Sequence, residues 1–312
     1  MTVKPPDFGG KPYRSLDYHL RDRYGEKIYK VSLDGGMTCP NRDGTLGKCG
    51  CIFCSEGGSG DFAGDRTHPI HQQIEEQKAR LSPKFPATHF IAYFQAYTNT
   101  YAPIEHLRMI FTEAITHPDV AVLSVATRPD CLGPDVLELL YDLNQIKPVW
   151  VELGLQTIHE ETASLIRRGY PLPVFDEAME HLKAIGVETV VHAILGLPSE
   201  TPDMILDTVR YINTSGADGI KLQLLHILKD TDLAAYYKDA GFHVLTLDEY
   251  VDLVIRCLEI SRPDLVIHRL TGDGPKDLLI APLWSQAKRQ VLNTIHRELK
   301  NRDTYQGRLY TP

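Results

Sequence analysis

The sequence of 312 residues contains no run of about 18 apolar residues, the length that a helix needs to cross a bilayer. Its first thirty residues also lack the basic, apolar and small-residue pattern of a secretory signal peptide. We therefore expect a cytoplasmic protein without a membrane segment. Internal repeats, low-complexity stretches and flexible linkers are missing as well, so the sequence favours one main domain with short extensions.

The chain also lacks the basic excess of an indiscriminate nucleic-acid binder, because its formal net charge is -8. The charge is unevenly distributed. Residues 1–30 carry seven Lys and Arg against four Asp and Glu, and residues 284–312 carry six against two. We expect any polyanion to meet these two ends of the chain, where the local balance is positive.

Short β-branched and aromatic runs alternate with longer amphipathic stretches, the pattern of repeated βα units and a parallel sheet. We expect an α/β fold, a partial (β/α)6 barrel over residues 27–245, with a basic helical extension over 1–26 and an α/β extension over 246–312. The predicted barrel strands are 27–33, 89–95, 120–126, 149–153, 188–195 and 219–225. The predicted helices are 16–24, 70–81, 104–117, 134–144, 160–168, 175–185, 202–215, 232–240, 247–261 and 285–301, with a further strand at 265–269.

Alternation along these strands places polar side chains on one face. In residues 149–156 the valines and leucines fall on one face, whereas Glu152 and Gln156 fall on the other. An enclosed polar interior near the carboxyl ends of the strands is where α/β barrels build their sites. The same alternation places several other polar side chains on the face opposite to their apolar neighbours, namely those of Tyr93, Gln95, Ser124, His192, Lys221 and Gln223.

Four of the six cysteines lie within residues 39–54, directly after the first predicted strand. In a reducing compartment, metal or redox chemistry explains such a group better than disulfides. Closely spaced cysteine thiolates can bind one iron-sulfur cluster from a tight turn, and a third thiolate from an adjoining loop gives three-point ligation. Three ligands leave one iron of a four-iron cluster open to S-adenosylmethionine (SAM). A zinc site that also uses Cys49 is the alternative, and the position of the loop at a polar barrel interior favours the cluster.

This loop resembles that of the radical SAM superfamily, and in particular the YhcC/YtqA-type branch related to the catalytic subunit of Elongator. The matching residues are Cys39, Cys51 and Cys54, with Phe53 beside the last cysteine. Cys49 falls where that branch more usually has glycine, so we interpret it as an extra thiol. Further segments resemble the branch in the same order along the chain, namely FQAYTNTY at 94–101, SVATRPD at 124–130, ELGLQT at 152–157 and GLPSET at 196–201.

The resemblance implies a radical SAM barrel in which a 4Fe-4S cluster on Cys39, Cys51 and Cys54 reductively cleaves SAM to a 5′-deoxyadenosyl radical. It also implies an electron donor of the flavodoxin or ferredoxin type. The residues implied for binding SAM are Phe53, Gln95, Asn99, Ser124, Glu152, Gln156, Arg168 and Gly196, among which Arg168 would pair with the cofactor carboxylate.

Simpler explanations exist for single residues of these segments. Glu152 alone could be an ion-paired structural carboxylate, Gly196 part of an ordinary turn, and residues 128–130 a helix cap. The chain also departs from related enzymes at Tyr170, where they often have histidine. A proton-transfer role is therefore not carried over to that position.

For the substrate, the resemblance implies tRNA, in which a carboxymethylaminomethyl group on the wobble uridine would become aminomethyl. Strand position makes Lys221, His192 and His226 the candidates for the substrate carboxylate and the leaving proton, with His268 and Arg269 as further candidates. A hydrogen-bonded core residue is the alternative for each histidine. A peptide or small metabolite as substrate, and a non-catalytic zinc-binding RNA-binding module, are the alternative functions.

Basic side chains near both ends of the chain are the candidates for contact with tRNA. A solvated helix face would explain the same charges. The candidates are Lys11, Arg14, Arg21, Arg23 and Lys27 at one end and Lys288, Arg289, Arg297, Lys300 and Arg302 at the other.

Overall fold

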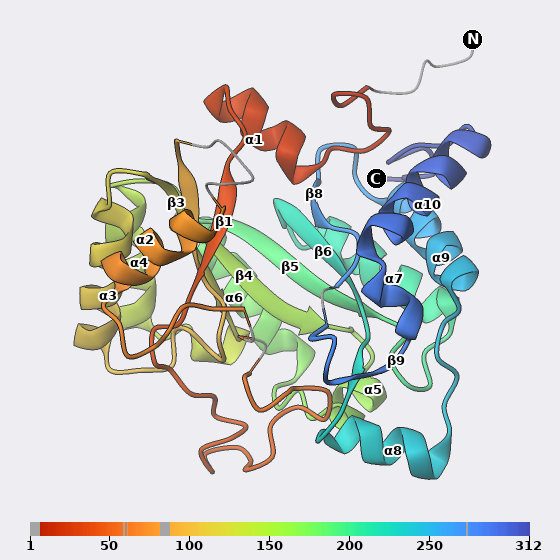
Figure 1. Ribbon diagram of the computed structural model, residues 1–312, viewed down its shortest axis with the longest axis horizontal. Coiled ribbons are helices and arrows are strands. Elements are labelled where there is room, and N and C mark those ends of the chain that lie inside the picture. The colour runs from red at the N-terminus through yellow and green to blue at the C-terminus, as the bar shows by residue number, and fades with distance from the viewer. Residues whose placement is uncertain (1–6, 59, 61, 82–87, 273) are drawn as a thin grey trace. The chain divides into compact units, whose positions relative to one another are not determined.

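The computed structural model describes residues 7–58, 60, 62–81, 88–272 and 274–312 (Figure 1). Seven strands form one sheet in the order β1-β2-β3-β4-β5-β6-β8, and a second sheet pairs β7 with β9. The expected α/β partial barrel, built from successive βα units, is confirmed. Within the described part of the chain, no helix is long and apolar enough to cross a membrane.

The chain divides into two compact units. Unit 1 comprises Met1–His19, Gln156–Arg168 and Val191–Pro312, and unit 2 comprises Leu20–Leu155 and Gly169–Val190. Helix α1 (Leu16–Tyr24) and strand β5 (Glu188–Leu195) each have residues in both units.

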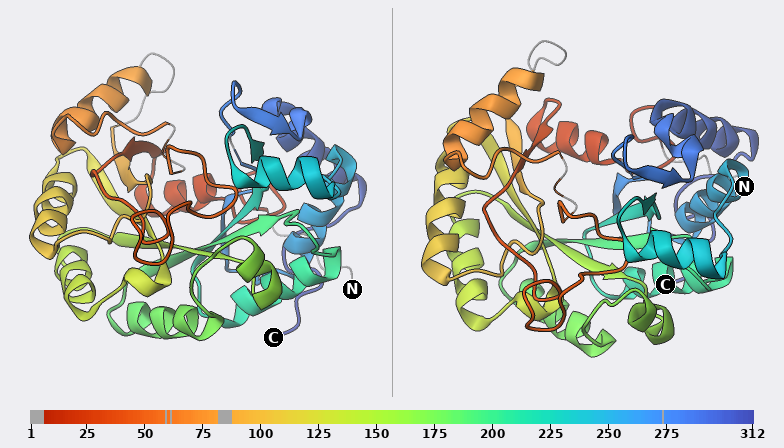
Figure 2. Two further views of the ribbon diagram at one scale, coloured as in Figure 1. Left: turned by 90° about the horizontal axis from the view of Figure 1, so that it is seen from below. Right: turned by 60° about the horizontal axis from the view of Figure 1, so that its bottom comes forward.

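Unit 2 contains the first part of the parallel sheet. Its strands are β1 (Tyr29–Leu33), β2 (Phe90–Phe94), β3 (Val120–Thr127) and β4 (Val149–Gln156), each parallel to the next. Helices α2 (Ile70–Leu81), α3 (Ile104–Thr116) and α4 (Pro134–Asn144) follow successive strands and lie on one face of them (Figure 2). All five residues of β2 are buried, as a central strand covered on both faces requires. Helix α6 (Leu172–Ala184) completes this unit.

Unit 1 contains the later βα elements and the C-terminal part of the chain. Strand β6 (Gly219–Leu224) pairs in parallel with β8 (Val266–Arg269), and β7 (Ile227–Leu228) pairs in antiparallel with β9 (Leu279–Ala281). Its helices are α5 (Glu160–Leu165), α7 (Pro202–Thr214), α8 (Asp232–Ala240), α9 (Leu247–Ile260) and α10 (Lys288–Asn301).

Most predicted elements are found within one or two residues of their predicted ends, and helices 16–24, 70–81, 134–144 and 232–240 are confirmed as predicted. The helix predicted over 160–168 is wrong at its end, because α5 stops at Leu165. Arg167 (φ 58°) and Gly169 (φ 85°) then turn the backbone into the left-handed region. The N–H of Arg168 donates to the carbonyl of Ala163, a bond typical of a helix C-terminus.

Two further differences concern the C-terminal extension. The helix predicted over 285–301 is divided at Ala287 into a short 3-10 helix (Leu283–Gln286) and α10. The β7-β9 pair was not predicted at all, because strands of two and three residues are too short to show a periodic pattern.

Candidate active site

The cysteine loop follows β1 in unit 2 and is held by its own backbone hydrogen bonds. The N–H of Arg42 donates to the carbonyl of Cys39 over 2.8 Å, and that of Cys54 to the carbonyl of Cys51 over 3.0 Å. The N–H of Gly50 donates to the carbonyl of Asn41 over 2.8 Å and so joins the two halves of the loop. These bonds bring the first cysteine near the later pair despite the sequence between them.

Gly50 and Arg42 stabilise the same loop through contacts within it. Gly50 has φ 75°, and a Cβ there would lie 2.8 Å from Nε of Arg42, so only glycine fits. The guanidinium of Arg42 donates to the carbonyls of Cys54 (3.1 Å) and Ser55 (2.5 Å). It also lies 5.7 Å from the ring centroid of Tyr97.

The predicted ligand cysteines differ from Cys49 in their environment. Cys39, Cys51 and Cys54 are half-buried, whereas Cys49 is exposed. Burial, with a smaller contribution from Cys54, raises the pKa of Cys51 to about 12. The Cys51 thiol is therefore protonated in the metal-free chain at neutral pH, and metal binding there would release a proton.

Asn41 contacts the sulfur of a predicted ligand. Its Nδ2 donates to Sγ of Cys51 over 3.5 Å. Gly169 packs against the same amide, since a Cβ at Gly169 would lie 2.7 Å from Oδ1 of Asn41 and 3.1 Å from Nη2 of Arg128. The sequence reasoning missed Asn41, although it stands two positions after Cys39.

Arg128, from the segment after β3, places a fixed positive charge near the cysteine loop. Its Nε and Nη2 donate to the two carboxylate oxygens of Asp130 over 2.9 and 2.7 Å. Its guanidinium lies 5.3 Å from the ring centroid of Tyr170. Despite burial, Asp130 and the nearby Cys39 and Cys51 raise the pKa of Arg128 above its usual value. A role of residues 128–130 as a helix cap alone would not explain why the guanidinium of Arg128 lies near Cys39 and Cys51.

The three predicted ligand cysteines form a donor set that suits an iron-sulfur cluster. Their half-buried thiols lie on one loop that backbone hydrogen bonds hold together, and three such thiols fit the three-point ligation of a 4Fe-4S cluster.

Asn99 offers an acceptor for a cofactor in the same unit. Its Nδ2 donates to the carbonyls of Phe94 (3.1 Å) and Ala126 (2.8 Å), which fixes the amide between β2 and β3. Its Oδ1 is buried and accepts no hydrogen bond from any described residue. Such an orphaned oxygen fits the amino group of SAM. The N–H of Thr98, next to it, donates to the carbonyl of Thr38 beside the first cysteine.

Glu152 and Ser124, both predicted to bind SAM, contact each other in the sheet. Ser124 Oγ donates to Oε1 of Glu152 over 2.9 Å, and Lys30 Nζ lies 2.6 Å from the same oxygen. The side chain of Glu152 is fully buried, so the ion pair is the compensation that its charge requires. The structural explanation of Glu152 is therefore supported, and its contact with the cofactor remains a prediction.

Phe53, Gln95 and Tyr170 also lie in unit 2. Phe53 and Gln95 are half-buried, and the N–H of Gln95 donates to the carbonyl of Leu33 at the end of β1. Tyr170 is buried and donates its hydroxyl hydrogen to the carbonyl of Gly154 in β4. It thus has a structural role, in agreement with the missing histidine.

The remaining predicted SAM-binding residues belong to unit 1. The guanidinium of Arg168 is buried and donates to the carbonyl of Thr157 (2.6 Å) and to Glu160 (2.9 Å). Gln156 has φ 68°, and its buried Oε1 has no hydrogen-bond partner in the described ranges. Gly196 has φ 89°, and a Cβ there would lie 3.1 Å from Leu245, so the turn requires glycine. The roles assigned to these three residues remain predictions.

The three catalytic candidates lie on or directly after β5 and β6. Nδ1 of His192 lies 3.2 Å from the amide nitrogen of Gln223. Because that nitrogen can only donate, Nδ1 accepts and the neutral ring carries its proton on Nε2. Lys221 is 3% exposed. The ring of His226 lies beside Gly272 and Gly274, where a Cβ would come within 2.7 and 3.3 Å of it.

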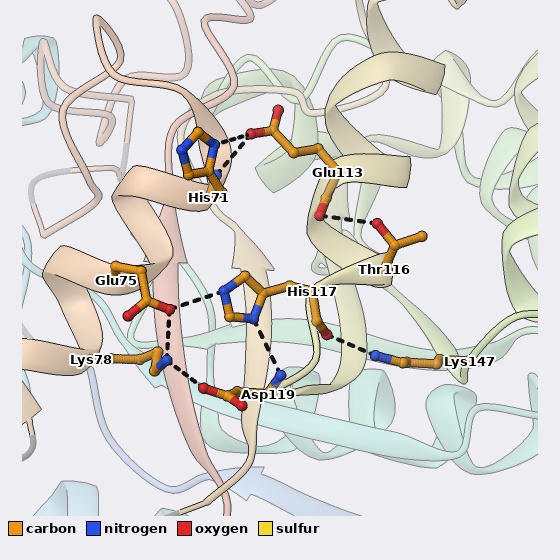
Figure 3. A network of polar contacts seen from close by, with 8 residues as sticks. All are labelled: His71, Glu75, Lys78, Glu113, Thr116, His117, Asp119 and Lys147. Carbon is orange, nitrogen blue, oxygen red and sulfur yellow. Dashed lines mark hydrogen bonds and ion pairs between the residues drawn. The ribbon is translucent and has the colours of Figure 1, made fainter.

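A second group of possible metal ligands consists of Glu75, His117 and Asp119, whose ligand atoms lie within 4.8 Å of one another (Figure 3). Asp119 directly precedes β3, at the end of the strand opposite to the cysteine loop. The ammonium of Lys78 contacts both Glu75 and Asp119 and so takes the place of a cation. This group is therefore a structural network that joins α2 to the segment before β3.

Comparison with known proteins agrees with this geometry. A model of the Radical SAM superfamily matches residues 38–212, and a model of the Radical_SAM C-terminal domain matches residues 217–301. The chain is 47% identical over 300 residues to uncharacterized protein YtqA of Bacillus subtilis, covering 96% of this chain and 93% of that protein. It is 36% identical over 269 residues to protein YhcC of Escherichia coli, covering 86% and 85%.

More distant similarity reaches Elongator-like proteins. A tRNA uridine(34) acetyltransferase of Dehalococcoides mccartyi is 24% identical over 184 residues, which cover 57% of this chain and 39% of that protein. The solved structure of Elp3 from the archaeon Methanocaldococcus infernus has a TM-score of 0.68 at 16% identity, a likeness of fold that covers 89% of this chain and 64% of that one. The resemblance of the cysteine loop is thereby confirmed, and the chain belongs to the radical SAM superfamily.

Proposed function

We propose that this enzyme modifies the wobble uridine of tRNA and converts a carboxymethylaminomethyl side chain to an aminomethyl group. The coarser activity follows from the family: the protein is a SAM-dependent enzyme with a 4Fe-4S cluster. The similarity to a tRNA uridine(34) acetyltransferase supports tRNA as the substrate. We further propose a flavodoxin- or ferredoxin-type protein as the electron donor.

A pair of cations on neighbouring strands is the observation that carries this proposal. Lys221 on β6 and Arg269 on β8 are register partners, so their side chains leave the sheet on the same face. Like charges opposite each other are unfavourable, and an anion bound beside them would relieve this repulsion. The carboxylate of the proposed substrate side chain is such an anion, and a guanidinium can bind it with two parallel hydrogen bonds.

The cluster and SAM, when bound, would supply a radical that removes one hydrogen atom from the methylene group between the nitrogen and the carboxylate. Loss of one further electron to an oxidised one-electron carrier would give an imine, which water would hydrolyse to the aminomethyl group and glyoxylate. The protein side chains would position these groups. Cys39, Cys51 and Cys54 hold the iron, and Lys221 with Arg269 orients the substrate carboxylate. His192, whose Nδ1 accepts from Gln223, is the first candidate to exchange a proton, and His226 is the second.

The test uses protein reconstituted anaerobically with iron and sulfide, then given dithionite, SAM and tRNA that carries carboxymethylaminomethyluridine. Chromatography measures 5′-deoxyadenosine, and mass spectrometry of digested tRNA measures the nucleoside product. We expect both products from the wild type and neither from Cys51→Ala. Cys49→Ala is the matched control and should retain both, because the Cys49 thiol is exposed.

Lys221→Met tests the carboxylate site separately. We expect deoxyadenosine to form while the modified nucleoside falls at least about tenfold, the effect of losing a charge-assisted hydrogen bond. Deoxyadenosine from the wild type with unchanged tRNA nucleosides would reject tRNA and point to a peptide or small metabolite as the substrate.

A further inference from the structure

A pocket of 690 Å³ opens beside the start of α10 in unit 1. It lies between this helix and the first turn of α9, and the two helices pack against each other (Figure 1). The polar residues that matter here are Asp248 of α9 and Lys288, Arg289, Thr294 and Arg297 of α10. None of them belongs to the predicted SAM or catalytic sites.

The backbone at this end of α10 favours an anion. The helix has 14 residues, and its N-cap residue, Ala287, has no side chain that could accept a hydrogen bond. The N–H groups of Gln290 and Val291 donate to the carbonyl of Ala287. The N–H of Arg289 has no acceptor among the described residues. Free N–H groups and the helix dipole together make such an end attractive to phosphate.

The side chains around the pocket add positive charge. Three cations, Lys288, Arg289 and Arg297, face one carboxylate, that of Asp248. The guanidinium of Arg289 forms no hydrogen bond or ion pair within the part of the chain that the structure describes. Among the described residues, the guanidinium of Arg297 pairs only with its neighbour Glu298, over 3.3 Å, and is largely exposed to solvent. Both guanidinium groups can therefore reorient toward a ligand without breaking a buried ion pair.

Thr294 is an independent sign that the pocket takes a ligand. This residue is 8% exposed and lines the pocket. A threonine inside a helix usually donates to the carbonyl four residues earlier. Thr294 forms no such bond, and its hydroxyl has no partner among the described residues. It is a nearly buried hydrogen-bond donor that a ligand oxygen would satisfy.

We infer that this pocket binds a backbone phosphate of RNA through the free N–H of Arg289, the Thr294 hydroxyl and the guanidinium groups of Arg289 and Arg297. The inference rests on the proposed function, since it names the surface by which the enzyme holds tRNA outside its reactive site. Arginine forks and a helix N-terminus both match the geometry of a phosphodiester. Phosphate contacts of this kind do not depend on the nucleotide sequence, so they position the RNA on the protein but do not select its sequence.

The test measures the Kd of the reconstituted enzyme for an unmodified tRNA transcript by fluorescence anisotropy over a series of salt concentrations. We expect Arg289→Glu to weaken binding about tenfold at low salt and to reduce the slope of log Kd against log salt by about one. Thr294→Val should weaken binding about threefold with an unchanged slope, because it removes a neutral donor. Asp248→Asn should strengthen binding, since it removes a negative charge that lines the pocket.

Lys238→Glu is the matched control, because it makes the same charge change at an exposed lysine of α8 outside the pocket. It should change the Kd less than about twofold. Equal weakening by Lys238→Glu and Arg289→Glu would reject the pocket as the binding site and leave only diffuse electrostatic attraction. If Arg289→Glu loses the binding of inorganic phosphate but binds tRNA like the wild type, the inference is also overturned and the pocket is a free-phosphate site. If the wild type itself binds no tRNA, the proposed function fails with it.

Discussion

The side-chain amide of Asn41 donates a hydrogen bond to the sulfur of Cys51 over 3.5 Å. Hydrogen bonds to ligand sulfurs stabilise the extra negative charge of a reduced cluster and so raise its reduction potential. We predict that Asn41→Leu, which removes this donor, makes the potential of the bound cluster more negative. A redox titration followed by electron paramagnetic resonance measures the change.

The iron content of the Asn41→Leu protein must be determined on the same sample. Unchanged iron with a lower potential means that the amide tunes the cluster, whereas lost iron means that it holds the loop together. A variant that keeps both the iron and the wild-type potential would contradict the prediction.

Gly169 supports the amide of Asn41 from the side. Its φ is 85°, and a Cβ there would lie 2.7 Å from Oδ1 of Asn41. Gly169→Ala should therefore cost about 3 kcal/mol of unfolding free energy, because an overpacking penalty adds to the backbone strain. It should also shift the cluster potential in the same direction as Asn41→Leu.

Gly186 provides the matched control for this substitution. Its φ is 70°, but a Cβ there would meet nothing within 4 Å. Gly186→Ala should cost only about 1 kcal/mol, the strain of a left-handed alanine. Denaturation by urea measures both values, and equal costs would show that the contact with Asn41 is unimportant.

The cysteine loop could be recognised from the sequence, whereas the residues that support it could not. Its position after a strand is a local property, and the assignment of Cys39, Cys51 and Cys54 as cluster ligands is a prediction from the family resemblance. The contacts of Asn41 and Arg128 depend on Gly169 and Tyr170, which come from a distant part of the chain. No local sequence pattern predicts that two such distant segments contact each other.

The same distinction explains the fold predictions. Helix α4 was predicted to the residue because Pro134 marks its first turn. The end of α5 was missed because Arg167 adopts a left-handed φ of 58°, which non-glycine residues rarely do. The alternation in β4 correctly set Glu152 apart from its apolar neighbours, but it could not reveal that Lys30 would neutralise the carboxylate.

That ion pair gives a prediction about stability. Lys30→Met removes the cation that neutralises the fully buried Glu152 carboxylate, and should cost about 3 kcal/mol of unfolding free energy. The double variant Lys30→Met with Glu152→Gln should recover most of this loss, because it leaves no buried charge. Denaturation by urea at neutral pH provides the measurement. A single variant as stable as the wild type would show that Glu152 does not depend on Lys30.

Glu200, in the turn after β5, gives a prediction about pH. Its carboxylate accepts a hydrogen bond from Thr157 over 2.5 Å, yet burial raises its pKa above the ordinary value. Hydrogen bonds from Thr157 and Thr162 and the charge of His159 oppose this rise without cancelling it. The folded state therefore holds the proton more tightly than the unfolded state does.

The sign of the effect follows from this difference in affinity. Below the ordinary pKa of a glutamate, the carboxyl is protonated in both states and its contribution to stability is complete. As the pH rises through the raised pKa of the folded state, the protein must bury a carboxylate and that contribution is lost. Glu200→Gln keeps an acceptor for Thr157 but cannot titrate. We expect it to be more stable than the wild type at about pH 7, with a difference that shrinks toward about pH 4. Denaturation of both proteins across this range checks the prediction, and a difference that does not vary with pH would contradict it.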